Sequence, residues 1–222
     1  YNREEKNEVT MDNNTILHSY QDWLKVQKMP AGKKKTLSAA VELFSRQGYN
    51  GTSTAQIAEK ASISQATIFK YFKTKEELLS EIIEPLIPEL KKEFLPKLKT
   101  YSKIEDVIHF IVQNRFRFLA QNADIIKIIL QEILVNSGLR QSLMAAIQDT
   151  IIDDLKMQLS RLQNDNPNIV TYQEDCEVIR TGLGLLFAYF FQRFVLEIST
   201  QSEEKDLKCI EEQLIKLITT KV

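Results

Sequence analysis

The sequence is poor in the residues that interrupt helices. Six glycines and five prolines make about 5% of the chain, against roughly 12% in an average protein. This shortage leaves little material for turns and predicts an all-α fold with short connections. With 222 residues, 43% of them hydrophobic and 27% charged, the chain has the composition of a globular protein of one domain or two modest ones. Global disorder does not fit these values.

Cysteine and histidine are also scarce. Cys176, Cys209, His18 and His109 stand far apart, outside any C-x-x-C pattern. This supply predicts no metal site, no cofactor and no Cys/His dyad, and idle thiols indicate a reducing compartment. The polar, charged start lacks the apolar core of a secretory signal, so we expect a cytoplasmic protein.

Long hydrophobic runs are missing as well. The longest stretches without a charged residue, such as 181–192, contain 12 residues. A membrane-spanning helix needs about 20 apolar residues. The sequence therefore predicts no membrane span.

The net charge of −1 hides an uneven distribution. Residues 33–76 contain eight Lys or Arg and three Asp or Glu, a net charge of +5, while residues 77–222 carry a net charge of −5. A small basic segment on a larger acidic body favours a polyanionic partner for that segment. A solvated lysine-rich face gives the same pattern, so charge alone does not decide.

Four helices are expected in the first third of the chain. An apolar stripe predicts an amphipathic helix over about 14–28, which Pro30-Ala31-Gly32 interrupts. A second helix is predicted from Leu37, Ala40, Val41 and Phe44 on one face, with Gly48 at its C-terminal end. Two short helices follow, one from the Ser53/Gln56 capping box to about Ala61 and one from its Ser64 cap over Gln65–Phe72.

Longer helices are expected in the remainder. A helix over 75–95 opens with a Thr74/Glu77 capping box and should kink or split at Pro85 and Pro88. Further helices are predicted over 103–120 and 123–135, along an i+4 ridge from Leu139 to Leu159, over 172–198 and over 203–220. The segment 164–168, rich in Asn and Asp with a proline, is the strongest loop signal.

The short helices between residues 53 and 72 have the spacing of a helix-turn-helix. Ala58 and Ala61 are small enough for two helices to cross closely. The last helix then presents Gln65, Thr67, Phe69 and Lys70 to solvent or to a DNA major groove. By itself this pattern also fits a structural corner.

The residues of this motif resemble a known family. The segment 48–78 reads GYNGTSTAQIAEKASISQATIFKYFKTKEEL. It is similar to the N-terminal signature of TetR/AcrR-type transcriptional regulators, with a match over about 33–80. Ser62 and Ala66 replace two glycines of that signature, and Ile68-Phe69 replaces its Leu-Tyr. If the turn needs a positive φ at Ser62, serine adopts it at a steric cost that glycine avoids.

The resemblance implies an extension over 1–32, a DNA-binding domain over 33–76 and an effector-binding and dimerisation domain over 77–222. It implies that hydroxyls at the start of the second motif helix lie near a phosphate, that the recognition helix meets base edges, and that other side chains clamp the backbone. The implied DNA-binding residues are Lys33, Lys34, Lys35, Thr52, Ser53, Thr54, Ser64, Gln65, Ala66, Thr67, Phe69, Lys70, Tyr71 and Lys75. A solvated helix start explains the lysine run equally well.

Proteins similar to TetR use the body to form a dimer and to hold a small effector. The apolar run 182–191 predicts a helix buried on all sides, and the last helix has the spacing of a coiled-coil seam. The dimer candidates are Gly182, Gly184, Leu207, Ile210, Leu214 and Leu217. The effector-pocket candidates are His109, Gln113, Phe116, Tyr189 and Phe190, for which exposure or ordinary core packing is the alternative. Arg180 and Arg193 either anchor an anionic effector or form salt bridges.

The function expected is that of a homodimeric, sequence-specific DNA-binding regulator, a repressor released from a pseudo-palindromic operator by a small, largely apolar effector. The rivals are an enzyme built on a helical bundle and a protein-interaction module that does not bind DNA. The sequence offers no H-E-x-x-H, G-x-S-x-G or Gly-rich phosphate loop, so an enzyme is not predicted. An interaction module leaves the basic excess on the motif unexplained.

Overall fold

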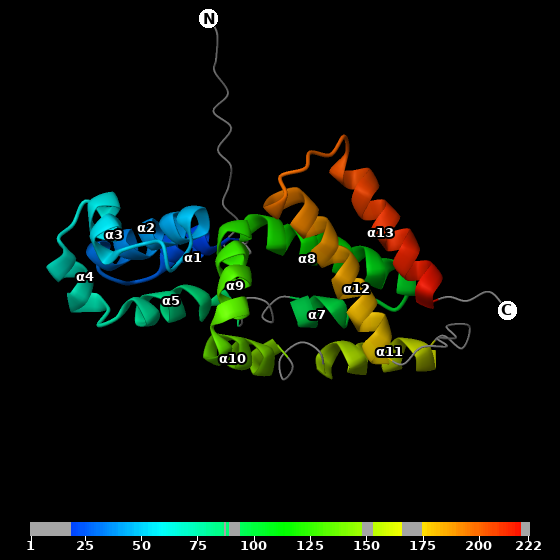
Figure 1. The fold of residues 1–222 in the computed structure, drawn as a ribbon. Helices are drawn as coiled ribbons and strands as arrows, with labels where there is room; N and C mark the ends of the chain where they lie inside the picture. The colour runs from blue at the N-terminus through cyan, green and yellow to red at the C-terminus, as the bar shows by residue number, and fades with distance from the viewer. Residues whose placement is uncertain (1–18, 87, 89–93, 148–152, 166–174, 219–222) are drawn as a thin grey trace, which may run out of the picture.

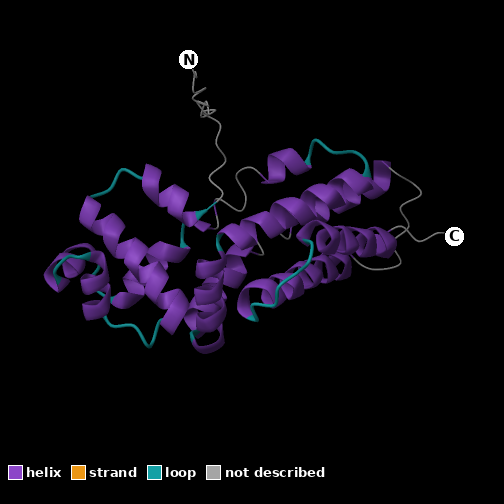
Figure 2. Cartoon of the chain, turned by 90° about the horizontal axis from the view of Figure 1, so that it is seen from above, coloured by secondary structure: helices purple, strands orange, loops and turns teal. Residues whose placement is uncertain are grey.

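The structure, a computed structural model, describes residues 19–86, 88, 94–147, 153–165 and 175–218. All regular secondary structure in these ranges is helical (Figure 2), as the composition predicts. Five helices form an N-terminal group, which we call the head: α1 (Tyr20–Val26), α2 (Ala31–Gln47), α3 (Thr54–Ala61), α4 (Gln65–Tyr71) and α5 (Lys75–Ile83).

The remaining helices form the body. They are α7 (Phe94–Leu98), α8 (Ile104–Gln121), α9 (Ala123–Val135), α10 (Ser137–Ile147), α11 (Asp153–Asp165), α12 (Asp175–Phe190) with its π-helical continuation η2 (Phe191–Val195), and α13 (Glu203–Ile218). Figure 1 shows α1–α5 at one end of the molecule and α7, α8 and α11–α13 at the other, with α9 between them. The helix α9 packs against α2 of the head, and α13 packs against α8 and α12.

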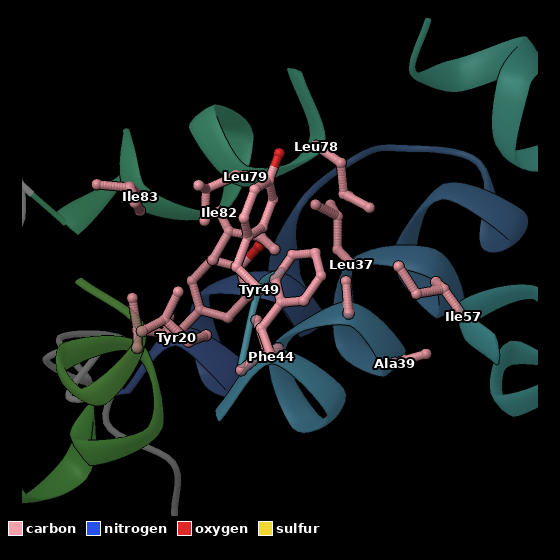
Figure 3. Packing of buried hydrophobic residues seen from close by; sticks show 14 of the residues in the cluster. Tyr20, Leu37, Ala39, Phe44, Tyr49, Ile57, Leu78, Leu79, Ile82 and Ile83 are labelled. Carbon is pink, nitrogen blue, oxygen red and sulfur yellow. The ribbon is translucent and has the colours of Figure 1, made fainter. Parts of the chain in front are cut away.

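The core of the head contains the face that the sequence predicts for α2. Leu37, Ala40, Val41 and Phe44 are all buried, and Gly48 follows the helix with φ of 81°. Figure 3 shows side chains from α1, α2 and α5 gathered around Phe44 and Tyr49. The ring centres of these two residues are 5.1 Å apart. Ile125, Ile128 and Ile129 of α9 belong to the same cluster. The cores therefore do not divide at residue 76, because α9 completes the core of the head.

The predicted helix over 14–28 is confirmed in part. Ser19 caps α1, Tyr20 and Leu24 are buried, and the Tyr20 amide donates to Asn122 Oδ1 at 2.8 Å, so α1 packs on the rest of the chain. Residues 14–18 lie outside the described ranges. Pro30 is the N-cap of α2, which therefore begins before the expected boundary at 33.

Several predicted ends need correction. The expected helix over 75–95 splits, since α5 ends at Ile83 and α7 begins at Phe94. Thr74 caps α5, but Glu77 Oε2 accepts from the amide of Lys73, at 2.8 Å, in place of the Thr74 amide expected of a capping box. The ridge from Leu139 belongs to two helices, α10 and α11, and its Ile151 lies outside the described residues, as does most of the predicted loop 164–168. Residues 196–198 are not helical.

The helix α12 with η2 differs most from its prediction. Leu186, Tyr189 and Phe190 are buried, but Leu183, Phe187 and Phe191 are 44%, 41% and 38% exposed, so the apolar run is not buried on all sides in this chain. The length of the charge-free runs predicts no membrane span. The helical segment Glu177–Val195 is nevertheless long and apolar enough to cross a membrane, by length and composition only, with a mean hydropathy of 1.2. One such helix is weak evidence for a membrane span, because core helices of globular proteins pass the same test.

Candidate nucleic-acid interface and ligand cavity

The turn between α3 and α4 forms as the sequence predicts. Ser53 Oγ accepts from the Gln56 amide and the Gln56 side chain accepts from the Ser53 amide, a complete capping box. Ser62 has φ of 54° and ψ of 47°, the left-handed conformation that the family signature fills with glycine. Ala58 and Ala61 are buried where the two helices meet.

The helix α4 has one face in the core and one in solvent. Ser64 caps it by accepting from the Thr67 amide at 3.1 Å, and Ile68 is 1% exposed. Gln65, Ala66, Phe69 and Lys70 are exposed and Thr67 is half-buried. Gln65 Nε2 also donates to Thr54 Oγ1 at 3.2 Å, which orients the glutamine amide. A recognition helix needs an outer face of this kind.

Thr52 does not fit its expected role at a phosphate. Its side chain is 1% exposed, and its hydroxyl donates to the Gly48 carbonyl at 2.8 Å while accepting from Gln47 Nε2. This side chain closes the loop between α2 and α3. Ser53 and Thr54 are more accessible, and Ser53 is exposed.

The lysine run lies within the first turns of α2, not ahead of the helix as the motif implied. Lys33 forms a salt bridge with Glu81 and lies 5.4 Å from the centre of the Phe72 ring. Lys34 donates to the Lys25 carbonyl at 2.7 Å. Lys35 is exposed, so among these three lysines it is the most accessible to a DNA phosphate.

Lys75 and Tyr71 are held by the head itself. Lys75 Nζ donates to the carbonyls of Tyr49 and Thr52, at 2.8 and 3.0 Å, and lies 4.2 Å from the centre of the Tyr49 ring. A Cβ on Gly32 would lie 3.1 Å from a ring carbon of Tyr71, so the start of α2 packs closely on that tyrosine. The ammonium of Lys75 therefore fastens the loop before α3, a role that the motif does not reveal.

A cavity of about 590 Å³ lies inside the body, within the range of sites for drug-sized ligands. Helices α5, α7–α13 and Leu86 contribute to its wall. The side chains are apolar except for Arg115 and Gln158, as far as the described lining shows. Arg115 lies 3.9 Å above the Phe94 ring and donates to Asn114 Oδ1, and burial lowers its pKa to about 10.

The predicted pocket residues do not line this cavity. His109 is exposed and pairs with Glu211 at 3.1 Å, and Gln113 donates to the same carboxylate at 2.9 Å. Phe116 is buried, with its ring 4.9 Å from that of Tyr189, and Phe190 is fully buried. The cavity faces the stripe of Ile104, Val107, Ile108, Ile111 and Arg115 on α8.

The predicted dimer stripe also needs correction. Leu207, Ile210 and Leu214 are buried in the core of their own subunit, while Leu217 is half-buried. A Cβ on Gly182 would meet Leu214 at 3.5 Å, so Gly182 faces α13, whereas a Cβ on Gly184 would meet nothing within 4 Å. Arg180 and Arg193 lie 3.8 Å from Glu177 and Glu203 respectively, which favours the salt-bridge alternative.

The loop before α13 is held by a hydrogen-bonded carboxylate. Asp206 accepts from the hydroxyls of Thr200 and Tyr189. These two bonds lower the pKa of Asp206, while burial and the bond to Asp206 raise the pKa of Tyr189 to about 12. The aromatic residue expected in a pocket thus joins α12 to α13.

An exposed recognition helix on a basic head, beside a body with an apolar cavity, defines a helix-turn-helix protein with a separate ligand-holding part. Residues 37–82 match the family described as bacterial regulatory proteins of the tetR family. The head therefore carries the DNA-binding motif of TetR/AcrR-type regulators, and the curated relatives that it matches, such as YhgD and QacR, are described as transcriptional regulators.

Three comparisons define the extent of the likeness. The HTH-type regulator YhgD of Bacillus subtilis is 28% identical over 134 residues, 56% of this chain and 69% of YhgD. QacR of Staphylococcus aureus is 43% identical over 51 residues, 23% of this chain and 27% of QacR. The structure of FadR from Bacillus subtilis in complex with stearoyl-CoA has a TM-score of 0.66 and 17% identity, over 85% of this chain and 98% of FadR, which shows a shared fold.

Proposed function

We propose that this DNA-binding regulator is a homodimeric repressor that leaves a pseudo-palindromic operator when a small apolar effector enters the body. The exposed face of α4 is the observation that carries the proposal, because the opposite face is closed into the core of the head. Residues 33–76 act as the DNA-binding unit and 77–222 as the effector and dimerisation unit, in the cytoplasm where the chromosome is accessible. Of the N-terminal extension over residues 1–32, the described residues 19–32 form part of the head.

Gln65, Ala66, Thr67 and Phe69 are proposed to read bases, and Lys70 to contact a phosphate. A glutamine amide pairs with adenine through two hydrogen bonds, and an aromatic ring contacts a thymine methyl. Ser53, Thr54, Ser64, Tyr71 and Lys35 are the remaining candidates for backbone contacts.

Base readout is tested by gel shift on the DNA upstream of the protein's own gene. Gln65→Ala is expected to cost about 1–3 kcal/mol on the operator and to leave binding to random DNA unchanged. Gln141→Ala is the matched control, because Gln141 is an exposed glutamine on α10, away from α4. Equal loss on operator and random DNA, or no loss at all, contradicts this placement of the recognition helix.

The outer face of α12 is proposed as the dimer interface. Leu183, Phe187, Phe191 and Val195 are exposed and recur every four residues, the spacing of a ridge that packs into a neighbouring helix. Leu183 and Phe187 also line the cavity, so the proposed interface borders the cavity. Gly184 lies beside this ridge with open space around it, so a partner helix can approach closely there. Two heads held in one dimer would read half-sites about 34 Å apart or a multiple of that distance.

Gly184→Leu tests the interface, because a Cβ at this position meets no atom of its own chain within 4 Å. Gly184 also lines the cavity, so effector binding is measured separately for this variant. We expect sedimentation to show a dimer for the parent and a monomer of unchanged fold for the variant. Gly182→Leu is the contrast: a Cβ at Gly182 already contacts Leu214 at 3.5 Å, so the rest of a leucine side chain must displace Leu214 and should lower thermal stability. A parent that sediments as a monomer at micromolar concentration rejects the proposal.

Effector release is proposed to pass through α5 and α9. Ile83 of α5 and Ile129 of α9 line the cavity and are also part of the core of the head. A ligand that moves either side chain therefore changes the packing of the head. A hundredfold release needs about 2.7 kcal/mol of coupling, within the usual range. That the related FadR was solved with stearoyl-CoA supports an effector with a long apolar part.

Reciprocity tests the switch. Compounds that raise the melting temperature are titrated against the protein with and without operator DNA. Operator must weaken effector binding by the same factor by which the effector weakens operator binding. Ligands that stabilise the body yet leave operator affinity unchanged reject the switch and leave DNA binding intact.

A further inference from the structure

Gln158 interrupts the cavity-facing stripe of α11. Leu155, Gln158, Leu159 and Leu162 all line the cavity, and their i, i+3, i+4, i+7 spacing is that of an apolar helix face. Gln158 is 6% exposed, comparable with Leu159 at 8% and Leu162 at 2%. A glutamine therefore stands where a leucine would complete the stripe.

The side-chain oxygen of Gln158 has no hydrogen-bond donor. Its Oε1 is buried and accepts no hydrogen bond in the described part of the chain. Buried polar groups in folded proteins are nearly always bonded, and one left without a partner lowers stability. Because the Gln158 side chain lines the cavity, a rotation of its terminal amide can turn this unpartnered acceptor toward a donor carried by the ligand.

We propose that the cavity binds an elongated, uncharged apolar molecule bearing one hydroxyl group, which donates its hydrogen bond to Gln158 Oε1. This assignment rests on the proposed function, in which the same cavity holds the effector. The apolar wall accommodates the hydrocarbon part, and the single acceptor selects for the hydroxyl.

Two related ligand classes fit the acceptor less well. A carboxylate at neutral pH has no proton to donate, and a thioester has none either. The charged side chain of the described lining, Arg115, is engaged with the wall through Phe94 and Asn114. A long-chain acid is thus the competing class, and Arg115 is the residue on which its binding would depend.

Calorimetry on the full chain distinguishes these classes with four probes of similar length: 1-decanol, decyl methyl ether, 2-undecanone and decanoate. We expect 1-decanol to bind at least tenfold more tightly than the ether and the ketone, a difference of about 1.4 kcal/mol. Equal affinity for the four probes, tighter binding of the ketone, or no binding of any probe overturns the proposal.

Two variants locate the effect. Gln158→Leu completes the apolar stripe, so it should fold, reduce the affinity for 1-decanol about tenfold and leave the ether unchanged. Met157→Leu is the control, because Met157 is 61% exposed on the same helix and does not line the cavity. Tighter binding of decanoate that is lost in Arg115→Met assigns the cavity to acids and overturns the proposal.

Operator titrations separate this inference from the proposed function. If 1-decanol binds with the expected hydroxyl preference but leaves operator affinity unchanged, the ligand class is supported and the switch is rejected. If a compound without a hydroxyl releases the operator and Gln158→Leu responds to it as the parent does, the switch is supported and the ligand class is rejected.

Discussion

Lys75 offers a sharp test of which lysines of the head contact DNA. Two of its ammonium hydrogens are donated to the carbonyls of Tyr49 and Thr52, and the Tyr49 ring lies 4.2 Å away. Hydrogen bonds to a charged group contribute about 1.5–3 kcal/mol to stability. Because Lys75 is partly exposed, we expect its two hydrogen bonds together to contribute near the lower end of this range. We expect Lys75→Met to lower stability by about 2 kcal/mol, or about 4–8 °C in melting temperature for a chain of this size.

The same variant should barely alter the salt dependence of DNA binding, because the ammonium is engaged within the head. For Lys70→Met we expect the opposite result: an unchanged stability and a weaker salt dependence of DNA binding. Lys70 is exposed on α4, so its loss should leave the melting temperature unchanged and reduce the slope of log K against log salt by about 0.9 for each subunit, or about 1.8 for the proposed dimer. Between 50 and 200 mM salt, that change corresponds to about 12-fold in affinity.

Fluorescence anisotropy on operator DNA at four salt concentrations, with thermal melting of each variant, measures both quantities. Lys216→Met, which removes an exposed charge on α13, controls for net charge and should change neither. If Lys75→Met reduces the slope by about 1.8, one phosphate contact in each subunit of the dimer, without loss of stability, the ammonium reaches a phosphate and the structural role of this lysine is refuted.

Two further predictions concern backbone and pH. Ser62→Gly should raise stability by about 0.5–1 kcal/mol in chemical denaturation, because glycine relieves the left-handed strain, whereas Ser62→Val should lower it; a less stable glycine variant contradicts the strain argument. Hydrogen bonds from Thr200 and Tyr189 lower the folded-state pKa of Asp206. The ionised carboxylate therefore stabilises the fold fully above its unfolded pKa of about 3.9, and this stabilisation is lost as the pH falls through the folded-state pKa. Melting temperatures between pH 6 and 3 should therefore fall less for Asp206→Asn than for the parent, and parallel curves argue against the linkage.

Much of the head was predictable because its signals are local. A capping box needs only Ser53 and Gln56 three residues apart, and Gly48, Ser62 and Ser64 act on the backbone next to them. The helical period of Leu37, Val41 and Phe44 identifies the buried face of α2 without knowledge of what covers it. These interactions span a few residues, and the sequence displays both partners.

The roles of Thr52, Lys33 and Lys75 were not predictable in the same way. Lys33 and Lys75 have partners far along the sequence, Glu81 and Tyr49. The acceptor of Thr52, Gly48, is only four residues away, but the burial of this hydroxyl depends on how the whole loop folds. The family motif identifies residues near DNA, but it does not distinguish those that contact DNA from those that shape the loop. Only the folded positions of both partners make that distinction.

The sequence by itself determined an all-helical chain, a helix-turn-helix between Ser53 and Phe72 and a basic head on an acidic body, because caps, periodicity and charge are properties of neighbouring residues. Only the tertiary structure decided which face of α8 lines the cavity, that Leu207, Ile210 and Leu214 fill the core of their own subunit, and that Gln158 is an acceptor without a donor. An apolar stripe states that a helix face must be covered. Whether another helix, a second subunit or a ligand covers it depends on how distant segments pack.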